Sequence, residues 1–163
     1  MNVRDLIRRP KRLADAGKWG DGGARGMPKS AFPLSRTRSF QLGKKWRWRV
    51  DLLDIGQGEA RLLTALDAGT ERFLAWLSVR RGDEFAIVAR YEFHGDHPGW
   101  HVHSQCGLVS GLTTAQIKPY GTRRLPPANK RHRRIGYDIT EAGAIAASFR
   151  VFRVISGNED SFL

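Results

Sequence analysis

The feature that most constrains the fold of this chain is a series of strand-like segments separated by short turns. In residues 45–55 apolar and polar side chains alternate, which is typical of a β-strand with one buried face. Short turns rich in glycine and aspartate lead on to four more such segments, at 60–66, 72–80, 84–93 and 100–105. Turns this short cannot carry the crossover that parallel strands require. The sequence therefore predicts a five-stranded antiparallel meander.

A helix is expected after the meander. Asp138 and Glu141 have the spacing of a capping box, and Gly157 is placed to stop a helix that runs to about residue 155. The predicted apolar stripe of this helix consists of Ala142, Ile145, Phe149 and Phe152. Packed across one face of the meander, the helix completes an α+β fold, and we expect residues 46–163 to form a single domain.

The net charge of +12 is concentrated in two segments. Residues 1–45 contain 12 lysines and arginines against 3 acidic residues, and residues 118–134 contain seven basic residues and no acidic one. Clustered cations raise the local potential and release counterions from phosphates, which evenly spread charge does less well. This distribution predicts a nucleic-acid partner, RNA more than DNA. A role in solubility alone and binding to an anionic membrane surface are the weaker alternatives.

Residues 1–45 are predicted to form a basic arm, with a short helix over 5–16 limited by Pro10 and an irregular stretch after it. We expect the sheet to fold without this arm. The arm and a basic loop at 118–134 supply the predicted phosphate contacts. These are Arg8, Arg9, Lys11, Arg12, Arg36 and Arg38 in the arm, and Lys118, Arg123, Arg124, Lys130, Arg131, Arg133 and Arg134 in the loop, where Tyr120 would stack on a base.

No apolar run is long enough to span a bilayer, and the first twenty residues are too charged for a signal peptide. The single cysteine, Cys106, cannot form an internal disulfide. A cytoplasmic protein without a membrane partner is expected. An arm of this composition is usually ordered only when it is docked, which favours a protein partner or a larger nucleoprotein assembly.

Four of the five histidines fall within ten residues, and they mark the predicted functional site. His101 and His103 project from the same face of a strand, His94 ends the preceding strand, and His97 lies in the connecting loop. The hairpin can bring all four to one rim. Imidazole titrates near neutral pH, which makes it useful chiefly for proton transfer and for binding metals.

Several chemistries fit this cluster. The histidines can be exposed without a function, or they can bind zinc or another divalent metal, with Asp96 or Cys106 completing the ligands. The interpretation we favour is a nuclease that cleaves RNA by general acid/base catalysis and requires no cofactor. In that hypothesis His101 and His103 are the acid and base. The residues expected to assist them are His94, His97 and Tyr91, with Arg123, Arg124 and Arg131 holding phosphates.

Three resemblances to known families rest on the same residues. The motif His101-Val102-His103 has the His-hydrophobic-His form of relaxases and replication-initiator nickases, which implies Tyr137 or Tyr120 as nucleophile. Read with Gln105, it also resembles the nucleotidyl-transferring branch of the histidine-triad superfamily, which implies His103 as nucleophile. Residues 46–107 are similar to small histidine-rich β-meander toxins of bacterial toxin–antitoxin pairs. That similarity is carried by Tyr91, Gly95, Asp96, His97, His101 and His103.

The toxin resemblance implies an RNA-directed growth inhibitor. The principal alternative to an enzyme is a basic, non-enzymatic subunit of a nucleoprotein assembly, in which the histidines are structural or bind zinc. The two classes differ in what the histidines do. In an enzyme their removal abolishes a reaction, and in an assembly subunit it matters only where a metal site stabilises the fold.

Overall fold

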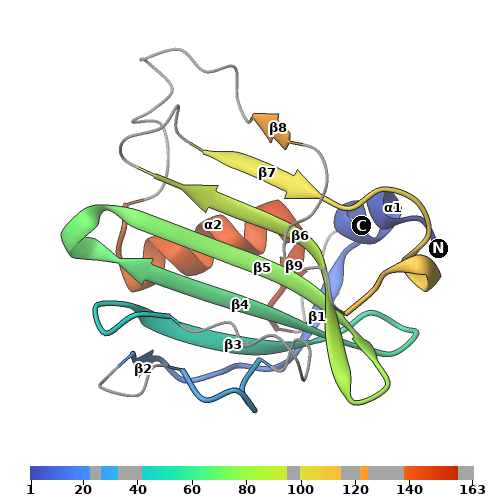
Figure 1. Cartoon of the computed structure of the whole chain (residues 1–163), viewed down its shortest axis with the longest axis horizontal. Helices are drawn as coiled ribbons and strands as arrows, with labels where there is room; N and C mark the ends of the chain where they lie inside the picture. Colours follow the sequence, from blue (N-terminus) through green and yellow to red (C-terminus); the bar gives the residue numbers. More distant parts are fainter. Residues whose placement is uncertain (23–26, 33–41, 95–99, 115–121, 125–137, 158–163) are drawn as a thin grey trace.

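The computed structural model describes residues 1–22, 27–32, 42–94, 100–114, 122–124 and 138–157, with the backbone alone at 122–124. The five strands of the predicted meander are confirmed, each within two residues of its expected bounds, and consecutive strands pair antiparallel (Figure 1). They are β3 (Arg47–Asp54), β4 (Glu59–Asp67), β5 (Arg72–Arg81), β6 (Glu84–Phe93) and β7 (His101–Ser104), with short 3₁₀ turns at Ala68–Thr70 and Val109–Gly111.

The sheet is larger than predicted, and it is mixed. β8 (Thr122–Arg124) extends it beyond β7, and β1 (Lys11–Asp15) extends it beyond β3. β2 (Gly20–Asp21) also pairs with β3, and β9 (Val154–Ile155) lies parallel to β1 at the opposite edge. A five-stranded, wholly antiparallel sheet was therefore the wrong prediction. The four added strands have two to five residues and, unlike β7, do not continue the series of alternating segments, so that long-range pairing alone defines them.

The predicted C-terminal helix is confirmed as α2 (Glu141–Phe152), but its cap and its buried face differ from the prediction. Thr140, and not Asp138, is the N-cap residue, since its side chain accepts from the Gly143 amide at 3.1 Å. The backbone at Asp138 instead packs closely on Gly143. A Cβ added at position 143 would lie 2.1 Å from the Asp138 carbonyl oxygen. The buried residues are Ala144, Ala147, Ser148 and Phe152, so of the predicted stripe only Phe152 is fully buried.

The described residues of the predicted arm, 1–22, 27–32 and 42–45, pack as part of the fold. α1 (Val3–Arg8) is shorter than the predicted helix over 5–16, because Pro10 ends it and the chain continues as β1. Val3 and Leu6 enter the main hydrophobic core. Met27, Phe32 and Leu42 cover the other face of the sheet. Apolar side chains of this segment thus take part in both cores, which argues against a sheet that folds independently of it.

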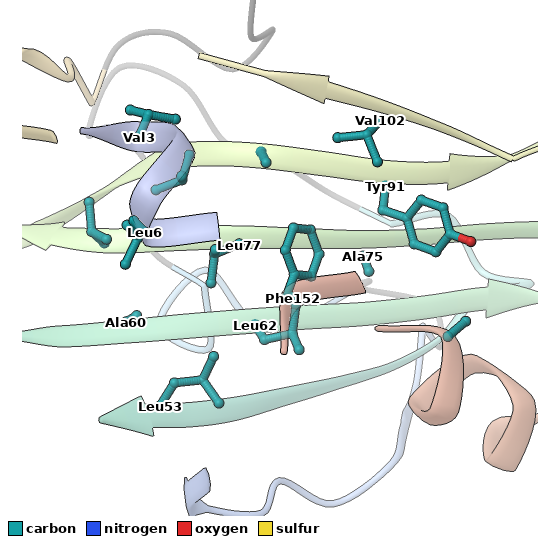
Figure 2. Packing of buried hydrophobic residues seen from close by; sticks show 14 of the residues in the cluster. Val3, Leu6, Leu53, Ala60, Leu62, Ala75, Leu77, Tyr91, Val102 and Phe152 are labelled. Carbon is teal, nitrogen blue, oxygen red and sulfur yellow. The ribbon is translucent and has the colours of Figure 1, made fainter. Parts of the chain in front are cut away.

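The sheet has two covered faces. On the first, α1 and α2 pack over the strands, and Figure 2 shows Leu6 and Phe152 in the same cluster as Leu62, Leu77 and Tyr91. A buried hydrogen bond of 3.0 Å between the hydroxyls of Thr64 and Ser148 joins β4 to α2 on this face. The second face carries the smaller cluster built by Met27, Phe32 and Leu42 with Leu63, Ala65, Leu74, Trp76 and Ile87.

A β-bulge in β6 decides which side chains reach each face. Ser78 pairs with Ile87 but Leu77 pairs with Ala89, so Val88 is an extra residue in the strand. Val88 and Ala89 both belong to the core under the helices. From the bulge onward the alternation is inverted, which places Tyr91 on the helix-covered face.

Lys11 is a buried structural residue and not a phosphate contact as predicted. Its side chain is 1% exposed, and its ammonium group donates to the carbonyl oxygens of Phe152 at 2.7 Å, Arg9 at 2.9 Å and Ile7 at 3.2 Å. Burial, with a smaller effect from Arg153, lowers the pKa of this ammonium group to about 8. The interaction fastens the end of α1 to the end of α2.

We predict that Lys11→Ala lowers the free energy of unfolding by about 3 kcal/mol, because three carbonyl groups, one of them in a buried hydrogen bond and two in part-buried ones, lose their charged donor. The neighbouring exposed variant Arg12→Ala is the control and should change stability by less than about 0.5 kcal/mol. Urea denaturation followed by circular dichroism measures both. Equal effects of the two substitutions would show that Lys11 does not hold the helices together.

Candidate functional site

The candidate site is a row of polar side chains on the second face of the sheet, at its β6–β7 end. The register places Arg90 opposite His103 and Glu92 opposite His101, and directly opposed residues of antiparallel strands share a face. His94 follows the last residue of β6, two positions after Glu92. The row therefore runs from the Arg90 and His103 pair, through the Glu92 and His101 pair, to His94.

Glu92 lies at the centre of this row and is 4% exposed. One carboxylate oxygen, Oε1, accepts from the Trp76 indole at 3.2 Å and from the Arg90 guanidinium. The other oxygen, Oε2, faces the histidines. It lies 3.6 Å from Nε2 of His94, 3.7 Å from Nε2 of His101 and 3.9 Å from Nε2 of His103. Three imidazole rings thus lie around a single carboxylate oxygen.

The three imidazole rings differ in how far solvent reaches them. His101, in the middle, is 14% exposed, whereas His94 and His103 are 33% and 27% exposed. The centroid of the His101 ring lies 5.5 Å from that of His94 and 5.0 Å from that of His103. The two outer rings are therefore the ones that a bound molecule reaches most easily.

The charges around Glu92 keep it ionised. Burial by itself raises the pKa of this carboxyl, but the hydrogen bond with His101, the positive charge of Arg90 and hydrogen bonds from Arg90 and Trp76 outweigh it. The pKa falls to about 2. Trp76 is held in turn by the Arg90 guanidinium, which lies 4.6 Å from the indole centroid.

His94 is kept neutral at pH 7. Burial is the largest effect and lowers the pKa of its imidazole, and the Glu92 carboxylate opposes this by favouring the charged form. The positive charges of His101 and Arg72 lower the pKa further, so that it lies below the usual value of 6.5. A neutral imidazole can accept a proton or bind a metal ion.

Glu92, His94 and His101 form a group that could hold a metal ion. One donor atom from each, a carboxylate oxygen or a ring nitrogen, lies within 4.8 Å of the other two. The sequence prediction that histidines of this hairpin could bind a metal is therefore supported in part. It omitted Glu92, which supplies the only oxygen of the group.

Tyr91 is not part of this site. Its ring lies on the opposite face of the sheet, stacked on Trp100 with centroids 5.0 Å apart and edge-on to Phe73 at 5.5 Å. The predicted assisting role was wrong because the bulge in β6 turns Tyr91 into the core. Trp100 is itself 5% exposed and packs in that core. Neither ring is therefore placed to stack on a base.

The predicted phosphate contacts are only partly placed. Arg124 pairs with His101 in the β7–β8 register, and Arg123 pairs with Val102. Arg8, Arg9 and Arg12 are exposed, but α1 packs beside Gly107 and so lies beyond the far end of β7 from His101 (Figure 1). The remaining predicted residues lie outside the described ranges. They are Arg36, Arg38, Asp96, His97, Lys118, Tyr120, Lys130, Arg131, Arg133, Arg134 and Tyr137.

Sequence reasoning missed Arg90, Glu92 and Trp76. A usable signal was present, because Arg90, Glu92 and His94 alternate along the strand in the same way as His101 and His103. When polar side chains occur at every second position of two neighbouring antiparallel strands, they are predicted to lie on the same face of the sheet. Trp76 had no such signal, since its indole is brought to Glu92 by the pairing of β5 with β6.

No protein-family model, curated protein or solved structure matches the chain. In the part of the chain that the structure describes, no helix has the length and apolar character needed to cross a membrane. The resemblances to toxins, nickases and histidine-triad proteins stay predictions, and function has to be argued from the site.

We predict that Glu92→Gln lowers the free energy of unfolding by about 2–3 kcal/mol at pH 7, because an amide keeps the shape but not the charge. A carboxyl whose folded pKa is depressed contributes stability above its unfolded pKa, near 4.5, and loses it as the pH falls towards the folded value of about 2. Urea denaturation at several pH values should therefore show that the free energies of unfolding of the wild-type protein and of Glu92→Gln converge below pH 4.5. A constant difference from pH 7 to pH 3 would mean that the charge of Glu92 is not what stabilises the fold.

Proposed function

We propose that the protein is a nuclease that cleaves phosphodiester bonds in RNA by general acid/base catalysis, without a required metal. The observation that carries this proposal is the row of three imidazoles around the ionised Glu92, with the two outer rings, His94 and His103, most exposed. Proton transfer at two oxygens of one phosphate needs two such groups on one surface.

The geometry favours His94 and His103 as the acid and base, in place of the adjacent pair His101 and His103 predicted from the sequence. The attacking and leaving oxygens lie on opposite sides of phosphorus, so the two catalytic groups should approach from opposite sides. In the β6–β7 register His94 and His103 lie at opposite ends of the row, with His101 between them. The lowered pKa of His94 suits the base.

In the proposed reaction, neutral His94 removes the proton from a ribose 2′-hydroxyl, whose oxygen attacks the adjacent phosphorus. The bond from phosphorus to the 5′-oxygen breaks, and protonated His103 donates its proton to that oxygen. The products are a 2′,3′-cyclic phosphate and a 5′-hydroxyl. Glu92 stabilises the imidazolium that forms on His94, because its Oε2 is 3.6 Å from that ring nitrogen.

RNA is the favoured substrate because it supplies its own nucleophile, so that the protein has to provide only an acid, a base and cations. The net charge of +12 favours a polyanion in general. Among the predicted phosphate contacts, Arg124 is the one whose backbone pairs with His101. We propose that it holds the phosphate that His94 and His103 act on. A growth-inhibiting role, as the toxin resemblance implies, is a consequence of such an activity.

The experiment compares His94→Ala and His103→Ala with the wild-type protein on single-stranded RNA. Each variant should lose cleavage by about 10²-fold or more, because general acid/base catalysis contributes on that scale, while RNA binding changes little. Cys106→Ser is the matched control, since Cys106 is exposed and does not belong to the row. Wild-type protein that binds RNA without cleaving it would overturn the proposal and leave a binding subunit as the function.

A further inference from the structure

We propose that Glu92, His94 and His101 bind one transition-metal ion of the zinc type, and that this ion inhibits the nuclease by occupying the base. The binding part stands on the geometry of the three side chains alone. The inhibition part rests on the proposed function, because it requires His94 to act as the base.

The donor atoms are close enough together to serve as ligands of one ion. The Glu92 oxygen is 3.6 Å from the His94 nitrogen and 3.7 Å from the His101 nitrogen, and the three donor atoms lie within 4.8 Å of one another. Two ligands of a tetrahedral zinc ion, each about 2.1 Å from the metal, lie roughly 3.4 Å apart. Small side-chain movements therefore suffice to close the group around an ion.

The surroundings of Glu92 leave one oxygen for the ion. Trp76 and Arg90 both donate to Oε1, so that Oε2 is the atom turned towards the imidazoles. Such partners fix the orientation of a ligating carboxylate and support the metal site. His103 lies at the other end of the row and does not belong to the trio. The His103 imidazole is therefore not a ligand of the proposed ion.

The donor set selects the class of ion. Two imidazole nitrogens and one carboxylate oxygen suit zinc, cobalt, nickel or copper, whereas magnesium and calcium take mainly oxygen ligands. Three protein ligands leave a fourth position of a tetrahedral ion open. A ring nitrogen that ligates a metal cannot also accept a proton, so a bound ion removes His94 from the proposed reaction.

The test is titration of the full chain, freed of metal with a chelator and dialysed, with Co²⁺ followed by its visible absorption. Calorimetry with Zn²⁺ and with Mg²⁺ completes the comparison. We expect one Co²⁺ or Zn²⁺ per chain and no binding of Mg²⁺. His94→Ala and Glu92→Gln should each weaken Co²⁺ binding by more than about tenfold. Variants that bind Co²⁺ as tightly as the wild-type protein would overturn the site.

Two further variants test whether the ion binds at another cysteine or histidine of the chain. Cys106→Ser and His132→Ala, which changes the one histidine outside residues 94–103, should retain Co²⁺ affinity, and loss of binding in either would place the ion elsewhere. Circular dichroism confirms that each variant is folded. RNA cleavage is then measured with and without one equivalent of Zn²⁺, and we expect at least a tenfold loss that chelation reverses.

The outcomes distinguish the two proposals. A protein that binds Co²⁺ through Glu92 and His94 but never cleaves RNA keeps the metal site and loses the nuclease, together with its inhibition. A protein that cleaves RNA after chelation but binds no transition metal keeps the nuclease and loses the metal site. Cleavage that rises when Zn²⁺ is added would overturn both inhibition and metal-free catalysis.

Discussion

The extra residue in β6, Val88, is the constraint on which the site depends. Because of it, Arg90 and Glu92 lie on the second face of the sheet with Trp76, and so do His101 and His103, which pair opposite them, while Tyr91 lies in the core under the helices. A strand without the bulge would present the opposite set of side chains. The one-residue change of register thus determines where the buried, ionised carboxylate and the three imidazoles around it lie on the sheet.

The rest of the fold makes this carboxylate stable. Glu92 is buried yet charged, which is tolerable because Trp76 and Arg90 hold one oxygen and the imidazoles surround the other. The sheet that carries these residues is held from behind by α2 and by α1, which Lys11 fastens together. The N-terminal segment that the charge pattern assigned to nucleic acid also contributes apolar side chains to both cores, among them Leu6 and Phe32.

The meander and the C-terminal helix could be predicted from the sequence, because β3 to β6 and α2 each extend over eight or more residues and β7 follows β6 in the same series of strands and short turns. The short strands β1, β2, β8 and β9 could not, since long-range pairing alone defines them. The histidines were found from their density in the chain. Glu92 was missed although it alternates with His94, because the bulge at Val88, which decides the face that Glu92 joins, leaves no mark in the pattern of apolar residues.

The chemical nature of the cleaved ends, determined with a chelator present, shows whether the ribose 2′-hydroxyl is the nucleophile. The substrate is an RNA in which every sugar is ribose except for one 2′-deoxynucleotide at a known cleavage position. Catalysis by His94 and His103 without a metal should give 2′,3′-cyclic phosphate and 5′-hydroxyl ends at other positions and no cleavage after the deoxynucleotide, because the attacking oxygen is missing there. Cleavage after the deoxynucleotide at the same rate, with 3′-hydroxyl and 5′-phosphate ends, would contradict it.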